Sequence, residues 1–156
     1  MDFFRTTNVS YFTIPVCWAI SLAPRVYSSK GYKKATGKAG FDGRHPRDFK
    51  DKIASDPALD SATKGRLIRA EAAVANGFEN LGLFAAAVAA GNSAHLDAGL
   101  MNTFSIAYIV SRFIYNHIYI YNDTVQLAGM RTVCYTGQII GLMFVFIKSG
   151  LKLNGA

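Results

Sequence analysis

Four long apolar stretches, interrupted by one strongly charged segment, constrain the fold of this chain more than any other feature. A transmembrane helix needs about 20 mostly apolar residues, and stretches of about that length cover residues 10–27, 67–90, 101–121 and 130–148. The last two connections are short, and short connections make consecutive helices antiparallel neighbours. The sequence therefore predicts an all-α integral membrane protein, a four-helix up-down bundle that forms one domain over residues 1–156.

Two other interpretations of the apolar stretches stay open. The first stretch could be a cleaved signal peptide, because Arg5 precedes it and Ala19–Ala23 resembles a cleavage site. The three later stretches favour a membrane protein in either case. The chain could also be a soluble helical bundle, but the run Ile139–Ile147 and the concentration of charge in one segment argue against it.

The charged segment, residues 28–66, predicts the orientation of the bundle. It holds ten Lys and Arg residues against five Asp residues, in a chain whose net charge is +7. Basic connections stay in the cytosol, so we expect a cytosolic loop with both termini on the other side. Such a loop attracts anionic lipid headgroups, whereas its few aromatic residues do not favour a nucleic-acid partner. We expect this loop to cap the site from the cytosol, with a helical turn starting at Asp56.

Metal and nucleotide chemistry have no local support in the sequence. Cys17 and Cys134 lie in apolar stretches and are expected to be buried free thiols. The chain has no clustered His and Cys set and no glycine-rich phosphate loop. We therefore predict that no metal is bound.

A polar stripe runs along the predicted helix 67–90. Its members recur at helical spacing, and small residues flank them, which permits close helix approach in membranes. The stripe consists of Arg69, Asn76, Glu79, Asn80 and Leu83. A charge near the bilayer centre costs about 3 kcal/mol or more, so Glu79 is expected to have a partner. The stripe could serve binding, or it could only hold helices together.

The two later helices carry matching polar faces. Arg112, Tyr115 and Tyr119 share one face of helix 101–121 with Asn116. Arg112 lies at a depth of about 15 Å, comparable to that of Glu79, which predicts a Glu79–Arg112 ion pair. That pair could fix helix register alone or also hold a charged ligand. Helix 130–148 presents Arg131, Tyr135 and Gln138 on one face, and Arg131 could instead reach out to lipid headgroups.

These motifs resemble the MAPEG family, the membrane-associated proteins in eicosanoid and glutathione metabolism. The first is Asn76-Gly-Phe-Glu79, which resembles the family's Asn-x-x-Glu signature. The second is Arg112 followed seven residues later by Tyr119, and the third is Arg131-Thr-Val-Cys-Tyr135 at the start of the last helix. The last two are similar to the family's prostaglandin E synthases. The resemblance covers residues 67–146 in detail.

The resemblance implies a homotrimer in the endoplasmic reticulum membrane, with active sites between subunits that open to the cytosol. It implies a glutathione-dependent transferase, peroxidase or isomerase, with glutathione as co-substrate and a lipophilic electrophile as the small-molecule substrate, beside membrane lipid. Arg131 and Tyr119 would be catalytic, with Arg131 beside the sulfur. The candidate glutathione-binding residues are Arg69, Asn76, Glu79, Arg112, Tyr115, Thr132, Tyr135 and Gln138, and Glu79 would lie near the amino group.

The chemistry of Arg131 agrees with that assignment. A free thiol has a pKa of about 8.5 and is mostly protonated at neutral pH. A guanidinium in a partly dry cleft favours the thiolate, which is the nucleophile, and it stays charged on burial. Thr132 could donate a hydrogen bond to the same sulfur.

One departure from the family pattern leaves the activity open. Many glutathione-binding members carry an arginine four residues before the asparagine, where this chain has Ala72. Arg69, on the same stripe, could substitute for it. One alternative is a glutathione-independent isomerase or cyclase of a hydrophobic, natural-product-like metabolite, with Tyr119, Glu79 and Arg131 moving protons. Another is a non-catalytic lipid-binding scaffold, for which the family has a precedent.

Overall fold

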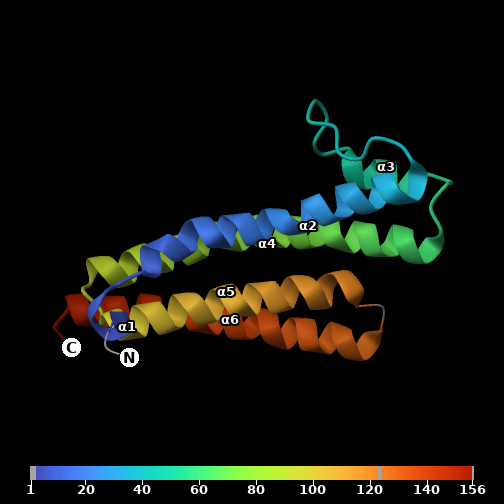
Figure 1. Cartoon of the computed structure of the whole chain (residues 1–156). Coiled ribbons are helices and arrows are strands. Elements are labelled where there is room, and N and C mark those ends of the chain that lie inside the picture. The colour runs from blue at the N-terminus through green and yellow to red at the C-terminus, as the bar shows by residue number, and fades with distance from the viewer. Residues whose placement is uncertain (1–2, 123, 156) are drawn as a thin grey trace.

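The described part of the chain, residues 3–122 and 124–155 of a computed structural model, is helical and contains no strand. Each of the four long helices runs antiparallel to the next one along the chain, and both chain ends lie at the end of the bundle opposite α3 (Figure 1). This arrangement confirms the predicted all-α up-down bundle. The elements are α1 (Phe3–Thr6), η1 (Ser10–Phe12), α2 (Thr13–Thr36), α3 (Phe49–Ser55), α4 (Ser61–Ser93), α5 (Ala98–Tyr121) and α6 (Val125–Leu153).

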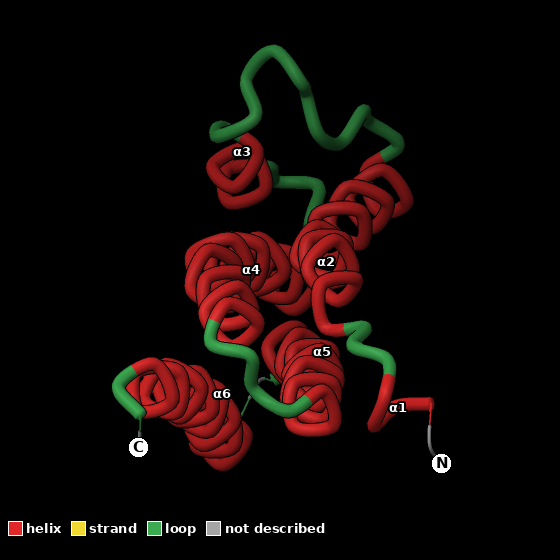
Figure 2. Tube along the Cα trace, turned by 90° about the vertical axis from the view of Figure 1, so that its left-hand side faces the viewer, coloured by secondary structure: helices red, strands yellow, loops and turns green. Residues whose placement is uncertain are grey.

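Helix α4 is the centre of the bundle. It packs against α2, α5 and α6, and α2 and α6 lie on opposite sides of it (Figure 2). The shortest of the four long helices has 24 residues and a length of about 36 Å, against a hydrocarbon thickness of about 30 Å. By length and composition, the segments Ser61–Ser93 and Gly129–Leu153 could each cross a membrane. Helices α2 and α5 have 24 residues each and are also long enough to span a membrane.

The helix boundaries differ from those predicted near the charged segment. Helix α2 continues beyond residue 27 to Thr36, and it stops at Gly37, whose φ of +71° suits a glycine at a helix end. Helix α4 begins at Ser61, where the Asp60 side chain accepts a hydrogen bond from the Thr63 amide at 2.9 Å. The connecting segment is therefore residues 37–60. The turn expected to start at Asp56 is present as a single turn: the Asp56 side chain accepts a hydrogen bond from the Ala58 amide at 3.0 Å, and the Asp56 carbonyl accepts one from the Leu59 amide at 3.4 Å.

Segment 37–60 folds onto α2 and α4 around a small core of its own. That core consists of Tyr32, Phe49, Ile53, Leu59 and Leu67. At its edge, the Asp56 carboxylate accepts hydrogen bonds from the Tyr32 hydroxyl at 2.5 Å and from Lys38 Nζ at 2.8 Å. The segment lies beside α2, on the side away from α5 and α6 (Figure 1). Within one chain it does not cover the polar faces of α5 and α6, so the expected cap over a site between subunits stays a prediction.

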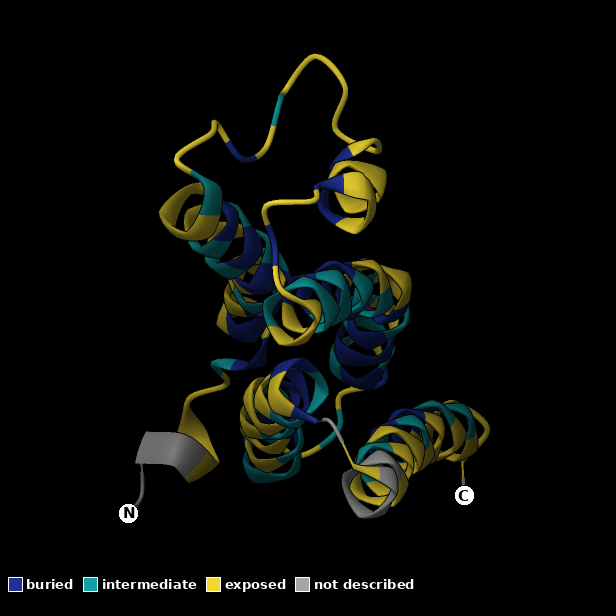
Figure 3. Cartoon of the chain, turned by 90° about the vertical axis from the view of Figure 1, so that its right-hand side faces the viewer, coloured by how far each residue is buried: buried dark blue, intermediate teal, exposed yellow. Residues whose placement is uncertain are grey.

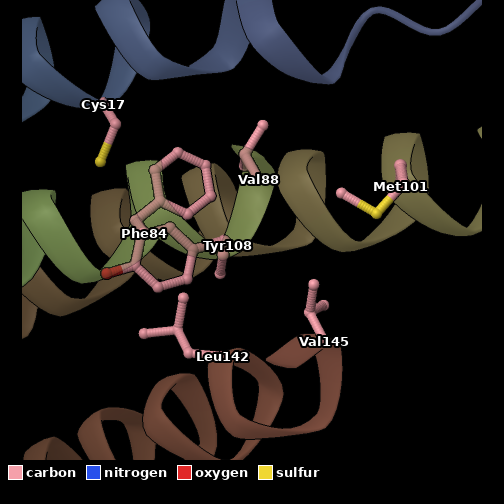
Figure 4. Close-up of a cluster of buried hydrophobic side chains, with 8 residues drawn as sticks. Cys17, Phe84, Val88, Met101, Tyr108, Leu142 and Val145 are labelled. Atoms are coloured by element: carbon pink, nitrogen blue, oxygen red, sulfur yellow. The ribbon is translucent and has the colours of Figure 1, made fainter. Parts of the chain in front are cut away.

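The main core lies where all four long helices meet (Figure 4). It consists of Cys17, Phe84, Ala87, Val88, Met101, Tyr108, Leu142 and Val145. Phe84 of α4 stacks on Tyr108 of α5 with ring centroids 4.2 Å apart. Cys17 is a buried free thiol and Cys134 is a half-buried one, so the prediction of free thiols is confirmed.

Small residues bring α2 and α4 together at mid-length. A Cβ added at Gly77 would lie 2.8 Å from Ser21 Cβ and 3.1 Å from Ser21 Cα. Glycine at this position therefore allows a contact that any side chain would push apart. The glycine within the Asn76–Glu79 motif thus has a packing role.

The outer faces of α5 and α6 are exposed (Figure 3). They carry large apolar side chains, among them Val110, Phe113, Ile114, Val133, Ile140, Phe144, Ile147 and Leu151. Apolar surface of this extent suits contact with lipid or with other protein. A membrane setting accounts for it without any further core.

Candidate functional site

Arg112 is the centre of a polar cluster that joins three helices. Its side chain is 1% exposed. Its Nη1 donates to Asn76 Oδ1 of α4 at 2.9 Å and to Gln138 Oε1 of α6 at 3.2 Å. A buried guanidinium requires acceptors, and two side-chain amides supply them here.

The predicted Glu79–Arg112 ion pair is therefore wrong. Glu79 is exposed on α4, and among the described residues it forms no ion pair with Arg112. Residues three apart on a helix differ by about 60° in direction. Asn76 points into the bundle, and that difference is enough to turn Glu79 out of it.

Two tyrosine rings lie between two guanidinium groups along the contact between α5 and α6, which we call the α5–α6 seam. Arg112 Cζ lies 4.9 Å from the centroid of the Tyr115 ring. Tyr115 and Tyr119 lie 5.5 Å apart between ring centroids. Arg131 Cζ of α6 then lies 4.4 Å from the centroid of the Tyr119 ring. Both contacts are within the range of cation–π attraction, so the rings hold both guanidinium groups.

A cavity of about 310 Å³ lies on the same seam, deeper than Arg131. Its wall is mostly apolar and includes Tyr108, Cys134 and Gln138. Cys134 Sγ donates to the Ser111 carbonyl at 3.6 Å, and Gln138 Nε2 donates to Cys134 Sγ at 3.7 Å. The cavity therefore offers an apolar space next to polar groups.

Two buried donors on the α5–α6 seam, one in the cavity wall and one beside Gln138, have no hydrogen-bond partner among the described residues. They are the Tyr108 hydroxyl and Arg112 Nη2. A buried donor without an acceptor costs roughly 1–3 kcal/mol. Each of the two groups could therefore donate a hydrogen bond to an oxygen atom of a ligand or of water.

The polar stripe of α4 does not act as one unit. Arg69 Nε donates to the Ile120 carbonyl at 3.1 Å, at the end of α5. Asn80 Nδ2 donates to the Asn76 carbonyl of its own helix at 2.9 Å. Of the five stripe residues, Asn76 alone reaches Arg112.

The other predicted site residues lie near the start of α6. Arg131 is half-buried against Tyr119, whereas Thr132 and Tyr135 are exposed. The structure thus brings Asn76, Arg112, Tyr115 and Gln138 into one cluster and Arg131 and Tyr119 into a second, adjacent one. It leaves Glu79, Thr132 and Tyr135 on the surface of the single chain.

One polar pair inside the bundle was not predicted. Glu71 of α4 is buried, and its Oε2 lies 2.7 Å from Arg25 Nε of α2. Its other oxygen accepts a hydrogen bond from Ser28. The sequence does contain an indication of this pair, because Arg25 and Glu71 are opposite charges within two predicted membrane segments. No group of three or more His, Cys, Asp or Glu side chains that could hold a metal occurs in the described part of the chain.

Comparison with known proteins gives the family. The sequence model of the MAPEG family matches residues 9–151, nearly the whole chain. This chain is a member of the MAPEG family. The family consists of membrane bundles and includes glutathione-dependent transferases and isomerases. No curated protein and no solved structure matches the chain.

MAPEG membership also decides between the interpretations of the apolar stretches. The matched region begins at residue 9 and includes the first stretch, so this stretch belongs to the family fold. The protein is a membrane protein, and the soluble bundle is excluded.

Proposed function

We propose that this protein is a glutathione-dependent transferase, with peroxidase or isomerase activity as variants of the same chemistry, that acts on lipophilic electrophiles. The observation that carries the proposal is the half-buried Arg131 held over the Tyr119 ring at 4.4 Å. Its guanidinium is fixed in place and stays charged, and no carboxylate among the described residues neutralises it. A fixed, unpaired cation is suited to binding a thiolate.

The donor set fits most of glutathione. Bound there, glutathione supplies a thiol. Arg131 would stabilise that thiol as its thiolate, and the Tyr119 ring would keep the guanidinium in place. Exposed Glu79 would bind the ammonium group, and Arg112 Nη2, which lacks a partner, would donate to a carboxylate. Thr132 and Tyr135 lie beside Arg131 on α6 and would complete the wall of this site.

The seam also offers a place for the second substrate. The cavity of about 310 Å³ next to Cys134 and Gln138 is lined mainly by apolar side chains. An apolar electrophile could enter it from the membrane with its reactive end toward Arg131. We propose that the site is completed in a homotrimer, since Glu79, Thr132 and Tyr135 lie on the surface of the single chain.

The direct test is turnover of a chloronitrobenzene-type substrate by the purified protein, with and without glutathione. We expect conjugation only when glutathione is present. Isothermal titration with glutathione in detergent then shows whether it binds in the absence of the electrophile. No binding and no conjugation would overturn the proposal.

The hydrogen bond that Arg69 already makes within the chain favours a second candidate function. Ala72 stands where many glutathione-binding members of the family carry an arginine, and Arg69 Nε is already bonded to the Ile120 carbonyl. One glutathione carboxylate could then lack its usual partner. The alternative is a glutathione-independent isomerase or cyclase of a hydrophobic metabolite, in which Tyr119, Glu79 and Arg131 transfer protons and stabilise charge. Turnover of such a metabolite without glutathione would establish it.

A further inference from the structure

A basic cavity lies at the end of the bundle that carries segment 37–60, between α2 and α4. Its volume is about 560 Å³. Lys30 and Lys34, one turn apart on α2, form one wall, and Thr63 and Arg66 of α4 form the other. The floor is a close helix contact, since a Cβ added at Gly31 would lie 2.8 Å from a Leu67 methyl group.

The three cations of this cavity have no counter-charge. Lys30, Lys34 and Arg66 are exposed and form no ion pair within the described residues. The acids nearby are engaged elsewhere. Asp56 is bonded to Lys38 and Tyr32, Glu71 to Arg25 and Ser28, and Asp60 to the Thr63 amide. The cavity therefore favours an anionic group.

An apolar groove continues from the basic cavity along the bundle. It lies between α2 and α5 and has a volume of about 460 Å³. Tyr27 lines both spaces. Tyr27 and Tyr121 lie 6.0 Å apart between ring centroids, and Arg66 Cζ lies 5.5 Å from the Tyr121 ring. The two tyrosines thus mark the junction between a charged space and an apolar one.

The dimensions match one leaflet of a membrane. Along α2 the apolar groove runs from Val16 to Tyr27, which is about 16 Å at 1.5 Å per residue. Half of a bilayer's hydrocarbon core is about 15 Å. Tyrosine is also enriched where the hydrocarbon meets the headgroups, which is where Tyr27 and Tyr121 would lie.

We propose that these two spaces form one binding site for an anionic glycerophospholipid. The phosphate lies among Lys30, Lys34 and Arg66, and one acyl chain lies in the groove between α2 and α5. This site is separate from the α5–α6 seam, and it does not depend on the proposed catalytic function.

The test measures bound lipid by native mass spectrometry after reconstitution in an equimolar mixture of phosphatidylglycerol and phosphatidylcholine. The variant Lys30→Gln/Lys34→Gln/Arg66→Gln removes the cations of the site. Lys33→Gln/Lys50→Gln/Lys64→Gln is the matched control, because it removes three charges from the same region but outside the cavity. We expect the wild type and the control to retain phosphatidylglycerol selectively. Each cation removed from the site should lower this retention about fivefold.

A second variant tests the acyl-chain groove without altering any charge. Ala19 is exposed in the groove wall, so Ala19→Phe should narrow the groove and lower phosphatidylglycerol retention while the protein stays folded. Free glycerol phosphate should not displace the lipid, because it has no acyl chain. Equal retention by the site variant and its control would overturn the proposal. Full retention by Ala19→Phe, displacement by glycerol phosphate, or no bound phosphatidylglycerol in the wild type would do the same.

Discussion

The contact between Arg131 and Tyr119 indicates that Tyr119 positions the guanidinium of Arg131. The guanidinium lies over the Tyr119 ring, so the ring face positions the cation, whatever its hydroxyl does. Such a contact is worth roughly 0.5–2 kcal/mol. Tyr119 was expected from the sequence to be catalytic, and the contact now suggests a positioning role that can be separated from chemistry.

The first prediction separates these roles by changing Tyr119. Tyr119→Phe keeps the ring and should retain kcat/KM for glutathione conjugation within about threefold of wild type. Tyr119→Ala removes the ring and should lower kcat/KM about tenfold, since 1.4 kcal/mol corresponds to a factor of ten. Steady-state kinetics at saturating electrophile measures both. If the phenylalanine variant loses as much activity as the alanine variant, the hydroxyl itself takes part in catalysis.

Gln138 is the residue whose removal should most directly disturb Arg112. It is buried and accepts a hydrogen bond from Arg112 Nη1. Gln138→Leu leaves that donor with fewer acceptors, and we expect a loss of about 1–3 kcal/mol in stability. Thermal unfolding in detergent measures the loss. Thr136→Val, on the exposed side of α6, is the control and should leave the unfolding midpoint unchanged. A midpoint of Gln138→Leu equal to that of wild type would contradict the buried hydrogen bond between Gln138 and Arg112.

At the scale of elements, the contact between α2 and α4 depends on glycine. Gly77→Ala would place its Cβ against the Ser21 backbone, and overpacking of this kind costs about 1–3 kcal/mol. The control lies on the same helix, since nothing lies within 4 Å of a Cβ added at Gly82. We predict a lower unfolding midpoint for Gly77→Ala and an unchanged or higher midpoint for Gly82→Ala, because alanine is the better helix former where its Cβ meets nothing. A midpoint of Gly77→Ala at or above wild type would mean that α2 and α4 are not packed this closely.

Segment 37–60 is held by a carboxylate, which makes its anchoring dependent on pH. Hydrogen bonds from Lys38 and Tyr32 lower the pKa of Asp56 below its usual range, and burial with the neighbouring Asp56 raises the pKa of Tyr32 to about 12. A carboxyl group whose pKa is lower in the folded state stabilises the fold above its unfolded pKa. That contribution is lost as the pH falls through the folded pKa.

We therefore predict that Asp56→Asn loosens segment 37–60 at neutral pH. Trypsin should cleave the variant faster within this lysine- and arginine-rich segment, whereas Asp48→Asn, at an exposed carboxylate, should be cleaved like wild type. The stability difference between wild type and Asp56→Asn should shrink as the pH falls below about 4. Equal cleavage rates, or a difference that grows in acid, would contradict the role of Asp56.

For the whole molecule, the sequence predicted the bundle but not the exact pairing inside it. The four apolar stretches and their short connections were sufficient for the topology, because hydrophobic periodicity is a local property. The extension of α2 to Thr36 was missed because Gly31 and the lysines around it resemble a loop. In the structure, Gly31 lies against Leu67, and Tyr32 belongs to the core of segment 37–60.

The sequence could not predict which buried polar side chains pair with each other. Matching depths suggested Glu79 for Arg112, but depth does not determine direction around the helix. Asn76, one turn from Glu79, points toward Arg112 instead. Glu71 forms its ion pair with Arg25, which lies on a helix distant in sequence. Rotation about the helix axis and the proximity of distant helices follow from packing, which a single sequence does not specify.

The most direct test of the proposed function is the pKa of the glutathione thiol bound to the purified protein, followed by the ultraviolet absorbance of the thiolate as the pH is varied. With wild type, we predict a thiol pKa well below the value of about 8.5 typical of a free thiol. Arg131→Ala should return it to that value, while size-exclusion chromatography shows an unchanged assembly. The same thiol pKa in both proteins would contradict the assignment of Arg131 as the residue that stabilises the thiolate.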